Sequence, residues 1–422
     1  MPKVFSKLFL LSLFFIYIYS LHFKGLPFNC NIILGCIGGM IYLWDLLCLK
    51  DKCQTIYIRK NSIYILLSLL FLLFLSLFSM VYNGTSDINI IKTIIIDIIY
   101  VFAVYLLVKY VRKIYGNTSF FIIAKYLTAA VTLQMILALL ISFEPAIKEV
   151  LLSSLMPTEN VASAIERLDG TRLIGFGTAF FTSGVINSFT LLVIAVVLRN
   201  FELKFGEYVF FVYSFVLIFG VGMMLARTTI VGMGLAVMYF IFTARWFVLK
   251  QVKKSLKACS LLFLLVVVVG FSLSEETRAQ FQVMSNFGFE LFNNYLKSGE
   301  LTTSSTRSMM YMYRFPEDIK TWIIGDGYFE NPYMPGYYYM RTDIGFLRLI
   351  YYFGLLGLFG YTLFQFVTIY QTWKNNNSLY TLFFLLCFLL YVILSLKGMT
   401  DVFMFITLFY FIDRSKVKSI II

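Results

Sequence analysis

Arginines placed beside apolar runs are the residues most able to do chemistry in this chain. Arg172 opens the segment Arg-Leu-Ile-Gly-Phe-Gly directly before an apolar run, and Arg227 lies in a short Ala-Arg-Thr turn between two such runs. Arg307 ends the segment Ser-Ser-Thr-Arg. The guanidinium fork matches pairs of phosphate oxygens, and a charge at a membrane boundary is costly unless it meets an anion or water. These arginines indicate a phosphate-bearing substrate, although solvated or interfacial arginines would give the same pattern.

Two aspartates are the candidate general bases. Asp326 lies in the segment Ile-Gly-Asp-Gly, and Asp343 lies directly before a later apolar run. Removal of a proton from a hydroxyl group needs a carboxylate or a histidine, and the only histidine is His22. Structural roles are also open, because Asp343 could cap a helix and Asp326 could form a turn between two glycines.

Basic and aromatic side chains around these segments could bind substrate. Tyr338 belongs to a dense tyrosine group whose ring faces could stack on sugars, although an aromatic belt at the membrane interface explains tyrosines equally well. Charged residues inside apolar runs could line a substrate path or pair with one another. The candidate substrate-binding residues are Arg314, Arg341, Arg348, Tyr338 and Lys397.

The elements that must position these residues are membrane helices. Of 422 residues, 60% are hydrophobic and 14% are charged, against about 45–50% and about 25% in soluble proteins. Apolar runs of about 20 residues are long enough to cross a bilayer. This excludes a soluble enzyme, a nucleic-acid-binding domain and a secreted disulfide scaffold. We predict an all-α polytopic membrane domain over residues 1–422 with about twelve spans: 5–23, 27–48, 62–82, 88–108, 120–142, 176–198, 207–225, 228–244, 258–273, 344–370, 379–396 and 401–412.

The charges orient these spans. Twenty of the 35 basic residues fall on one side of the predicted topology, and an excess of Lys and Arg marks cytoplasmic loops. We therefore expect a protein of the cytoplasmic membrane with both termini inside. The net charge of +13 follows from these loops and does not require a nucleic-acid partner.

Two longer loops lie on the predicted outer face, at residues 143–175 and 274–343. The second separates spans nine and ten and is far longer than an ordinary helix connection. It carries several basic residues, which suggests an anionic ligand, although long loops translocate regardless of charge. Within it, Gln280–Leu296 has apolar residues spaced as in a helix lying on the membrane surface.

The order of these segments resembles the Wzy-type O-antigen and capsular polysaccharide polymerases, within the O-antigen ligase superfamily. Arg172-Leu-Ile-Gly is similar to that family's Arg-x-x-Gly segment, and Ala-Arg227-Thr is similar to its Ser-Arg-Thr/Gly turn, with alanine in place of serine. Ser-Ser-Thr-Arg307 followed by Ile-Gly-Asp-Gly is similar to its late-loop signature. Arg314 and Gly325 also fit an Arg–ten residues–Gly spacing described for such polymerases.

The resemblance implies a metal-independent, inverting glycosyltransferase of GT-C-like fold that needs no cofactor. Its donor and acceptor would be glycans linked to undecaprenyl pyrophosphate in the bacterial inner membrane, and a separate chain-length regulator would be a partner. Arg172, Arg227 and Arg307 would stabilise the pyrophosphate leaving group. Two alternatives remain: a flippase for lipid-linked oligosaccharides, and an O-antigen ligase, which is disfavoured because the ligases place a histidine near the late span where this chain has none.

Overall fold

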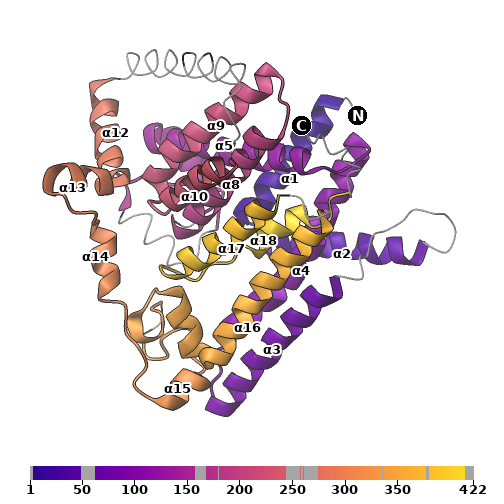
Figure 1. Ribbon diagram of the computed structural model, residues 1–422, viewed down its shortest axis with the longest axis vertical. Helices are drawn as coiled ribbons and strands as arrows, with labels where there is room; N and C mark the ends of the chain where they lie inside the picture. The colour runs from indigo at the N-terminus through magenta and orange to yellow at the C-terminus, as the bar shows by residue number, and fades with distance from the viewer. Residues whose placement is uncertain are drawn as a thin grey trace. The chain divides into compact units, whose positions relative to one another are not determined.

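The computed structural model describes residues 3–48, 62–156, 168–178, 180–243, 257, 260, 274–334, 336–376 and 380–413. These residues form helices joined by turns and loops (Figure 1). Across the described ranges, pairing of extended chain is limited to two isolated bridges, Phe23 with Leu155 and Glu330 with Tyr338. The predicted all-α fold class is therefore confirmed.

The chain packs as two compact units. The first comprises Met1–Tyr17, Leu26–Ile123 and Ser304–Ile422, and the second comprises Ile18–Gly25 and Ala124–Thr303. Each unit therefore combines segments from distant parts of the sequence. The candidate residues Arg172 and Arg227 belong to the second unit, and the other eight belong to the first.

The helices of the first unit begin with α1, which continues two residues into the second unit. They are α1 (Lys3–Tyr19), α2 (Cys30–Cys48), α3 (Ser62–Asn83), α4 (Asn89–Tyr115), α14 (Ser304–Met310), α15 (Ile319–Ile323), the 3₁₀ turn η1 (Tyr339–Arg341), α16 (Gly345–Asn375), α17 (Thr381–Ser395), α18 (Phe403–Ile406) and the 3₁₀ turn η2 (Thr407–Phe409).

The helices of the second unit include most of α5, whose first turn belongs to the first unit. They are α5 (Phe120–Phe143), α6 (Pro145–Ser153), α8 (Phe180–Asn200), α9 (Phe205–Leu225), α10 (Thr229–Phe242), α12 (Glu275–Gly288) and α13 (Glu290–Ser298).

Six of the described helices are long and apolar enough to cross a membrane. They are α3, α4, α5, α8, α9 and α16, and they match the predicted spans three to seven and span ten. Shorter apolar helices α1, α2, α10 and α17 overlap the predicted spans one, two, eight and eleven. The chain is therefore a polytopic membrane protein.

Three predicted elements differ from the structure or fall outside it. Residues 401–412 do not form one helix: α18 has four residues and η2 has three, too few to cross about 30 Å of hydrocarbon. The predicted helix Gln280–Leu296 is divided at Phe289 into α12 and α13. Span nine, 258–273, lies outside the described residues apart from position 260.

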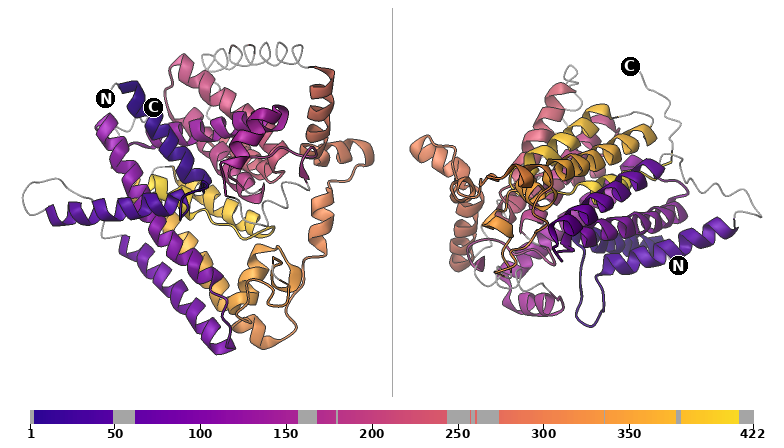
Figure 2. Two further views of the ribbon diagram at one scale, coloured as in Figure 1. Left: turned by 180° about the vertical axis from the view of Figure 1, so that it is seen from behind. Right: turned by 90° about the horizontal axis from the view of Figure 1, so that it is seen from below.

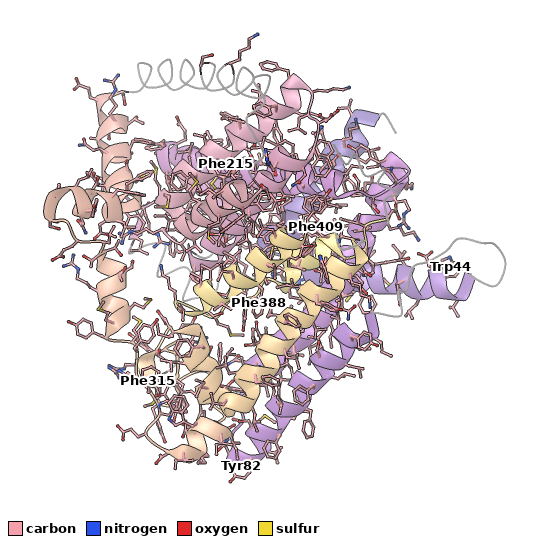
Figure 3. The ribbon with its side chains drawn as sticks, in the orientation of Figure 1. Trp44, Tyr82, Phe215, Phe315, Phe388 and Phe409 are labelled. Atoms are coloured by element: carbon pink, nitrogen blue, oxygen red, sulfur yellow. The ribbon has the colours of Figure 1, made fainter. Side chains whose placement is uncertain are left out.

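Close packing in the first unit depends on glycines. Helix α2 packs along α4, where a Cβ added to Gly35 or Gly38 would collide with the backbone of Ile99 or Phe102. Helix α3 packs along α16, and both views of this pair show them side by side (Figures 1 and 2). Tyr82 marks the end of α3 in Figure 3.

Helix α16 is interrupted at Phe353 and Gly354, whose backbone angles are not helical. Gly354 has φ +71°, a conformation that glycine adopts at little cost. A Cβ at Gly354 would collide with the backbone of Ile323 and Ile324, so α15 and the loop after it lie directly against the interruption. The long predicted span ten is therefore two helical pieces joined at a glycine.

Helix α8 forms the centre of the second unit, and all its residues from Ser183 to Val197 are buried. Helices α9 and α10 both pack on it. The backbone of α10 reaches α8 because Gly232 has no side chain where it meets Ser188. A buried helix between two neighbours fixes the turn that joins α9 to α10.

Candidate functional site

Arg172 and Arg227 lie together in the second unit. Each interacts with the ring of Phe287, at 5.3 Å from the Arg172 guanidinium carbon and 4.0 Å from that of Arg227. Arg172 also lies over the ring of Phe180, at 3.4 Å from its centroid. The two arginine motifs of the sequence thus form one site at one end of helices α8, α9 and α10.

The segment after Arg172 is fixed by apolar anchors. Leu173 and Ile174 are buried, and the amide of Leu173 donates to the Met224 carbonyl at 3.3 Å. Gln134 of α5 donates to the Phe176 carbonyl at 3.1 Å, and a Cβ at Gly175 would lie 2.8 Å from that same glutamine amide. The apolar residues of the Arg-x-x-Gly segment are therefore buried, and they hold Arg172 at the edge of the packed helices.

The turn that carries Arg227 is held by α8. Ser188 donates to the carbonyl of Thr228 at 3.0 Å, and Thr229 donates to the Gly222 carbonyl at 3.1 Å. Gly184 leaves room for the Thr228 side chain. Small and hydroxyl side chains thus set the position of Arg227 through its neighbours.

Arg227 has protein partners of its own. Its Nε donates to the Phe287 carbonyl at 2.8 Å, and its guanidinium forms an ion pair with Glu290 at the start of α13. Burial lowers the pKa of Arg227, and Glu290 opposes that change. Neither Phe287 nor Glu290 is among the predicted site residues, because both lie in a stretch whose spacing predicts an amphipathic surface helix.

Arg172 differs from Arg227 in its hydrogen bonding. Its Nε and one terminal nitrogen are shielded from solvent and have no hydrogen-bond acceptor among the described residues. Burial, followed by repulsion from Arg227, lowers the pKa of Arg172 to about 9. An unsatisfied buried donor costs about 1–3 kcal/mol, so this pair of cations is suited to an anion that accepts hydrogen bonds from Arg172.

A second arginine site lies in the first unit. The guanidinium of Arg348, which is 8% exposed, lies between the rings of Tyr338 at 3.4 Å and Phe329 at 3.9 Å. Its Nε has no acceptor in the part of the chain that is described. Asp343 and Glu330 interact with it electrostatically. The predicted substrate-binding residues Arg348 and Tyr338 are therefore in contact.

The two candidate bases have different surroundings. The Asp326 carboxylate accepts hydrogen bonds from Lys320 at 2.9 Å, Thr321 at 2.8 Å and Tyr339 at 3.3 Å. Asp343 is exposed and does not cap α16, whose N-cap is Ile344. Desolvation raises the pKa of Asp343, and Arg348 opposes this rise. Asp343 is consequently the better placed of the two to accept a proton.

The Gly-Asp-Gly segment has a structural role at the interruption of α16. The amides of Asp326 and Gly327 donate to the carbonyls of Tyr351 and Tyr352 at 2.7 and 3.0 Å. These carbonyls precede the break, where a continuous helix would supply its own donors. The loop before α4 supports the segment through Asp87, which accepts from the amides of Phe329 and Glu330 at 2.7 and 3.0 Å. Asp87 carries no signal of this role in the sequence, because its partners lie more than 240 positions away.

The remaining candidates lie in the first unit without a common site. Arg307 is exposed on α14, and Arg314 is exposed while its carbonyl accepts from Tyr351 at 3.1 Å. Arg341 is exposed and contacts the sulfur of Met334 at 3.1 Å. Lys397 follows α17 and is half-buried. No group of three or more His, Cys, Asp or Glu side chains that could hold a metal occurs in the described ranges.

Comparisons with protein-family models, with curated proteins and with solved structures found no match for this chain.

Proposed function

We propose that the protein is a polysaccharide polymerase of the bacterial cytoplasmic membrane that joins oligosaccharide repeat units carried on undecaprenyl pyrophosphate. The observation that supports this most is the unsatisfied guanidinium of Arg172 beside Arg227 at the end of buried helices. A diphosphate has adjacent anionic oxygens that accept several hydrogen bonds from arginines. Two of the motifs that resemble the polymerase family, those of Arg172 and Arg227, meet here.

In the proposed reaction an acceptor hydroxyl attacks the anomeric carbon of the donor sugar, and the bond from that carbon to the diphosphate oxygen breaks. Arg172 and Arg227 stabilise the negative charge that grows on the leaving diphosphate. Glu290 orients Arg227. On the sequence motifs alone, Asp343 is proposed as the base for the acceptor proton and Arg307 as a further diphosphate ligand. Tyr338, Arg348, Arg314, Arg341 and Lys397 are proposed to bind the glycan chains.

The first test uses purified protein in liposomes with a lipid-diphosphate oligosaccharide. We expect longer lipid-linked glycans and free undecaprenyl pyrophosphate, and we expect Arg172→Met and Arg227→Met to lower the rate at least about 100-fold, on the scale of one lost transition-state donor. Lys148→Met is the matched control, because it removes one positive charge from an exposed ion pair with Asp169 in the same unit. Unchanged rates in both arginine variants would refute the proposed role of the pair.

A flippase for lipid-linked oligosaccharides is the second candidate function, and the interruption of α16 favours it. Transporters often place discontinuous helices around a substrate site, and Phe353–Gly354 is such a break. Gene deletion separates the two functions. Loss of a polymerase leaves single repeat units at the cell surface, whereas loss of a flippase removes surface glycan while lipid-linked units accumulate inside. A ligase would instead leave polymer on its lipid carrier.

A further inference from the structure

Among the residues that the structure describes, Asp97 on α4 is the one acidic residue that is buried. It is 4% exposed and lies within a candidate membrane span. An ionised carboxylate in such surroundings needs a cation or several hydrogen-bond donors, and intramembrane acids are retained mainly for function. None of the groups assigned to the proposed polymerase reaction contacts it.

The partner of Asp97 is another acid. The side chains of Asp97 and Asp401 lie within hydrogen-bonding reach of each other. One oxygen of Asp401 also accepts from the side-chain amide of Gln365 and from the backbone amide of Phe403, both at 2.7 Å. Ionised carboxylates have no hydrogen to donate, so a bond between two carboxyl groups requires a proton on one of them.

The geometry assigns the proton to Asp97. Asp401 receives two N–H donors, which stabilise a negative charge, whereas Asp97 has Asp401 as its hydrogen-bond partner. Within the described ranges neither carboxyl takes part in an ion pair. A lysine or arginine therefore does not replace the proton as the source of positive charge.

The groups around the pair are neutral and polar. The titratable side chains that interact with it are Tyr17 of α1, Tyr361 of α16 and Tyr391 of α17. The side-chain amide of Gln365, which is fully buried, and the hydroxyl of Tyr361 interact with each other beside the pair. These polar groups next to an acid pair could pass a proton to or from it.

We infer that Asp97 and Asp401 form a proton-binding site in the membrane part of the first unit, in which the two carboxyl groups share one proton. The site is independent of the proposed polymerase reaction. It joins α4 to the segment that leads into α18. Loss of the proton places two negative charges in contact and pushes this segment from α4.

That movement would reach the start of α16. Gly398, three residues before Asp401, touches Gly345 so closely that a Cβ on Gly345 would collide with the Gly398 backbone. Gly345 begins α16, which carries Arg348 in its first piece. Protonation of the pair therefore sets the position of the segment against which α16 begins.

Infrared spectroscopy of the full-length protein in lipid nanodiscs tests the site. At pH 8 we expect one carbonyl band of a protonated carboxyl group, separate from the bands of ionised carboxylates. Labelling of aspartate with ¹³C should shift this band in the wild-type protein, which assigns it to an aspartate without any mutation. Absence of the band at pH 8, or a band that aspartate labelling leaves in place, would overturn the proposal.

Variants then locate the proton. Asp97→Asn supplies a neutral donor to Asp401 and should abolish the band, while Asp318→Asn should leave it unchanged, because Asp318 is exposed and makes no capping hydrogen bond. A band that persists in folded Asp97→Asn protein contradicts the assignment. If Asp97→Asn does not fold, Asp401→Asn provides the second test: it removes the charged acceptor and should shift the band instead.

Discussion

Arg172 and Arg348 show the same local design in different units. Each guanidinium carbon lies over an aromatic ring, at 3.4 Å from the centroid of Phe180 and of Tyr338 respectively. Each also keeps a buried Nε without an acceptor in the described structure. Aromatic faces attract the cation without using its N–H groups. The rings thereby hold each arginine in place and leave its buried Nε for a ligand.

Replacing Arg172 with methionine should stabilise the empty protein and remove anion binding. Methionine keeps the apolar contact with Phe180 but carries no buried unsatisfied donors, whose cost is about 1–3 kcal/mol. We therefore expect Arg172→Met to unfold at a higher temperature than wild type. Pyrophosphate at 100 times its Kd should stabilise wild type by about 2.7 kcal/mol and leave the variant unchanged. Thermal unfolding with and without pyrophosphate measures both effects.

The same experiment needs a charge control. Lys148→Met loses the same charge but keeps the arginine pair, so its response to pyrophosphate should equal that of wild type. An Arg172→Met variant that is less stable than wild type would mean that Arg172 has a structural partner. A response to pyrophosphate that survives the substitution would place the anion elsewhere.

Anion binding should weaken as the pH rises above about 9. Burial lowers the folded pKa of Arg172 to about 9, so the cost of holding its charge is fully present below pH 9 and is relieved as the pH rises from there toward the ordinary pKa of arginine. A bound anion favours the charged form, and its affinity therefore falls once the empty site loses that charge. Calorimetric titration of pyrophosphate from pH 7 to about 10 should show this fall in wild type. An affinity that stays constant over this range would contradict the link to Arg172.

At the scale of elements, the interruption of α16 depends on two glycines that lie far apart in the sequence. Gly325 and Gly354 have φ of +81° and +71°. A Cβ at Gly325 would lie 2.5 Å from the backbone of Tyr352 and Phe353, while one at Gly354 would collide with the backbone of Ile323. The close approach of the two backbones at these glycines allows the amides of Asp326 and Gly327 to reach the carbonyls that precede the break in α16.

Alanine at either glycine should therefore be strongly destabilising. We expect Gly325→Ala and Gly354→Ala to cost about 3 kcal/mol or more, because left-handed backbone strain adds to a collision with backbone that cannot move aside. Gly84→Ala separates these causes: Gly84 has φ +62° but open space around it, so strain alone should cost about 1–2 kcal/mol. Unfolding in detergent gives the three values. Equal losses of stability at all three positions would exclude a role for the close approach of the two backbones.

The sequence predicts elements where a single run of residues decides the outcome. Helices α3, α4 and α5 follow from the length of their apolar runs. The break in α16 could not be predicted, because it depends on Gly325 meeting Phe353, a contact between residues in separate segments. The same holds within the sites. Arg172 and Arg227 stand out by type and position, whereas Glu290 is one of many loop acids until folding places it against Arg227.

The partner of Asp97 shows a second limit of sequence reasoning. Charged residues in the predicted spans are expected to line a path or to pair with one another, yet Lys92 is exposed and Asp97 meets another acid, Asp401. Lys125 does pair with an acid, Glu207, at 3.4 Å. Two buried acids can pair only through a shared proton, and a sequence carries no sign of where that proton lies.

At the scale of the whole molecule, basic residues at one end of the spans are partly neutralised within the fold. Lys109 and Arg112, in the last turns of α4, form ion pairs with Asp45 and Asp413. Surface pairs of this kind add about 0–1 kcal/mol to stability. These basic residues matter more for the orientation of the protein, because an excess of Lys and Arg keeps a loop in the cytoplasm.

The two ends of α4 provide a direct test of orientation. Gly84 precedes α4 and Gly116 follows it, both are exposed, and a Cβ at either position meets open space. In a background with the six native cysteines replaced, we expect Gly84→Cys to react with a membrane-impermeant maleimide added to intact cells. Gly116→Cys, beside the basic end of α4, should react only after lysis. Gly299→Cys, in the long predicted outer loop, should behave like Gly84→Cys. Labelling of Gly116→Cys alone in intact cells would mean that the orientation is the opposite of the predicted one. The predicted outer loops would then face the cytoplasm, where a polymerase that uses exported lipid-linked units could not work.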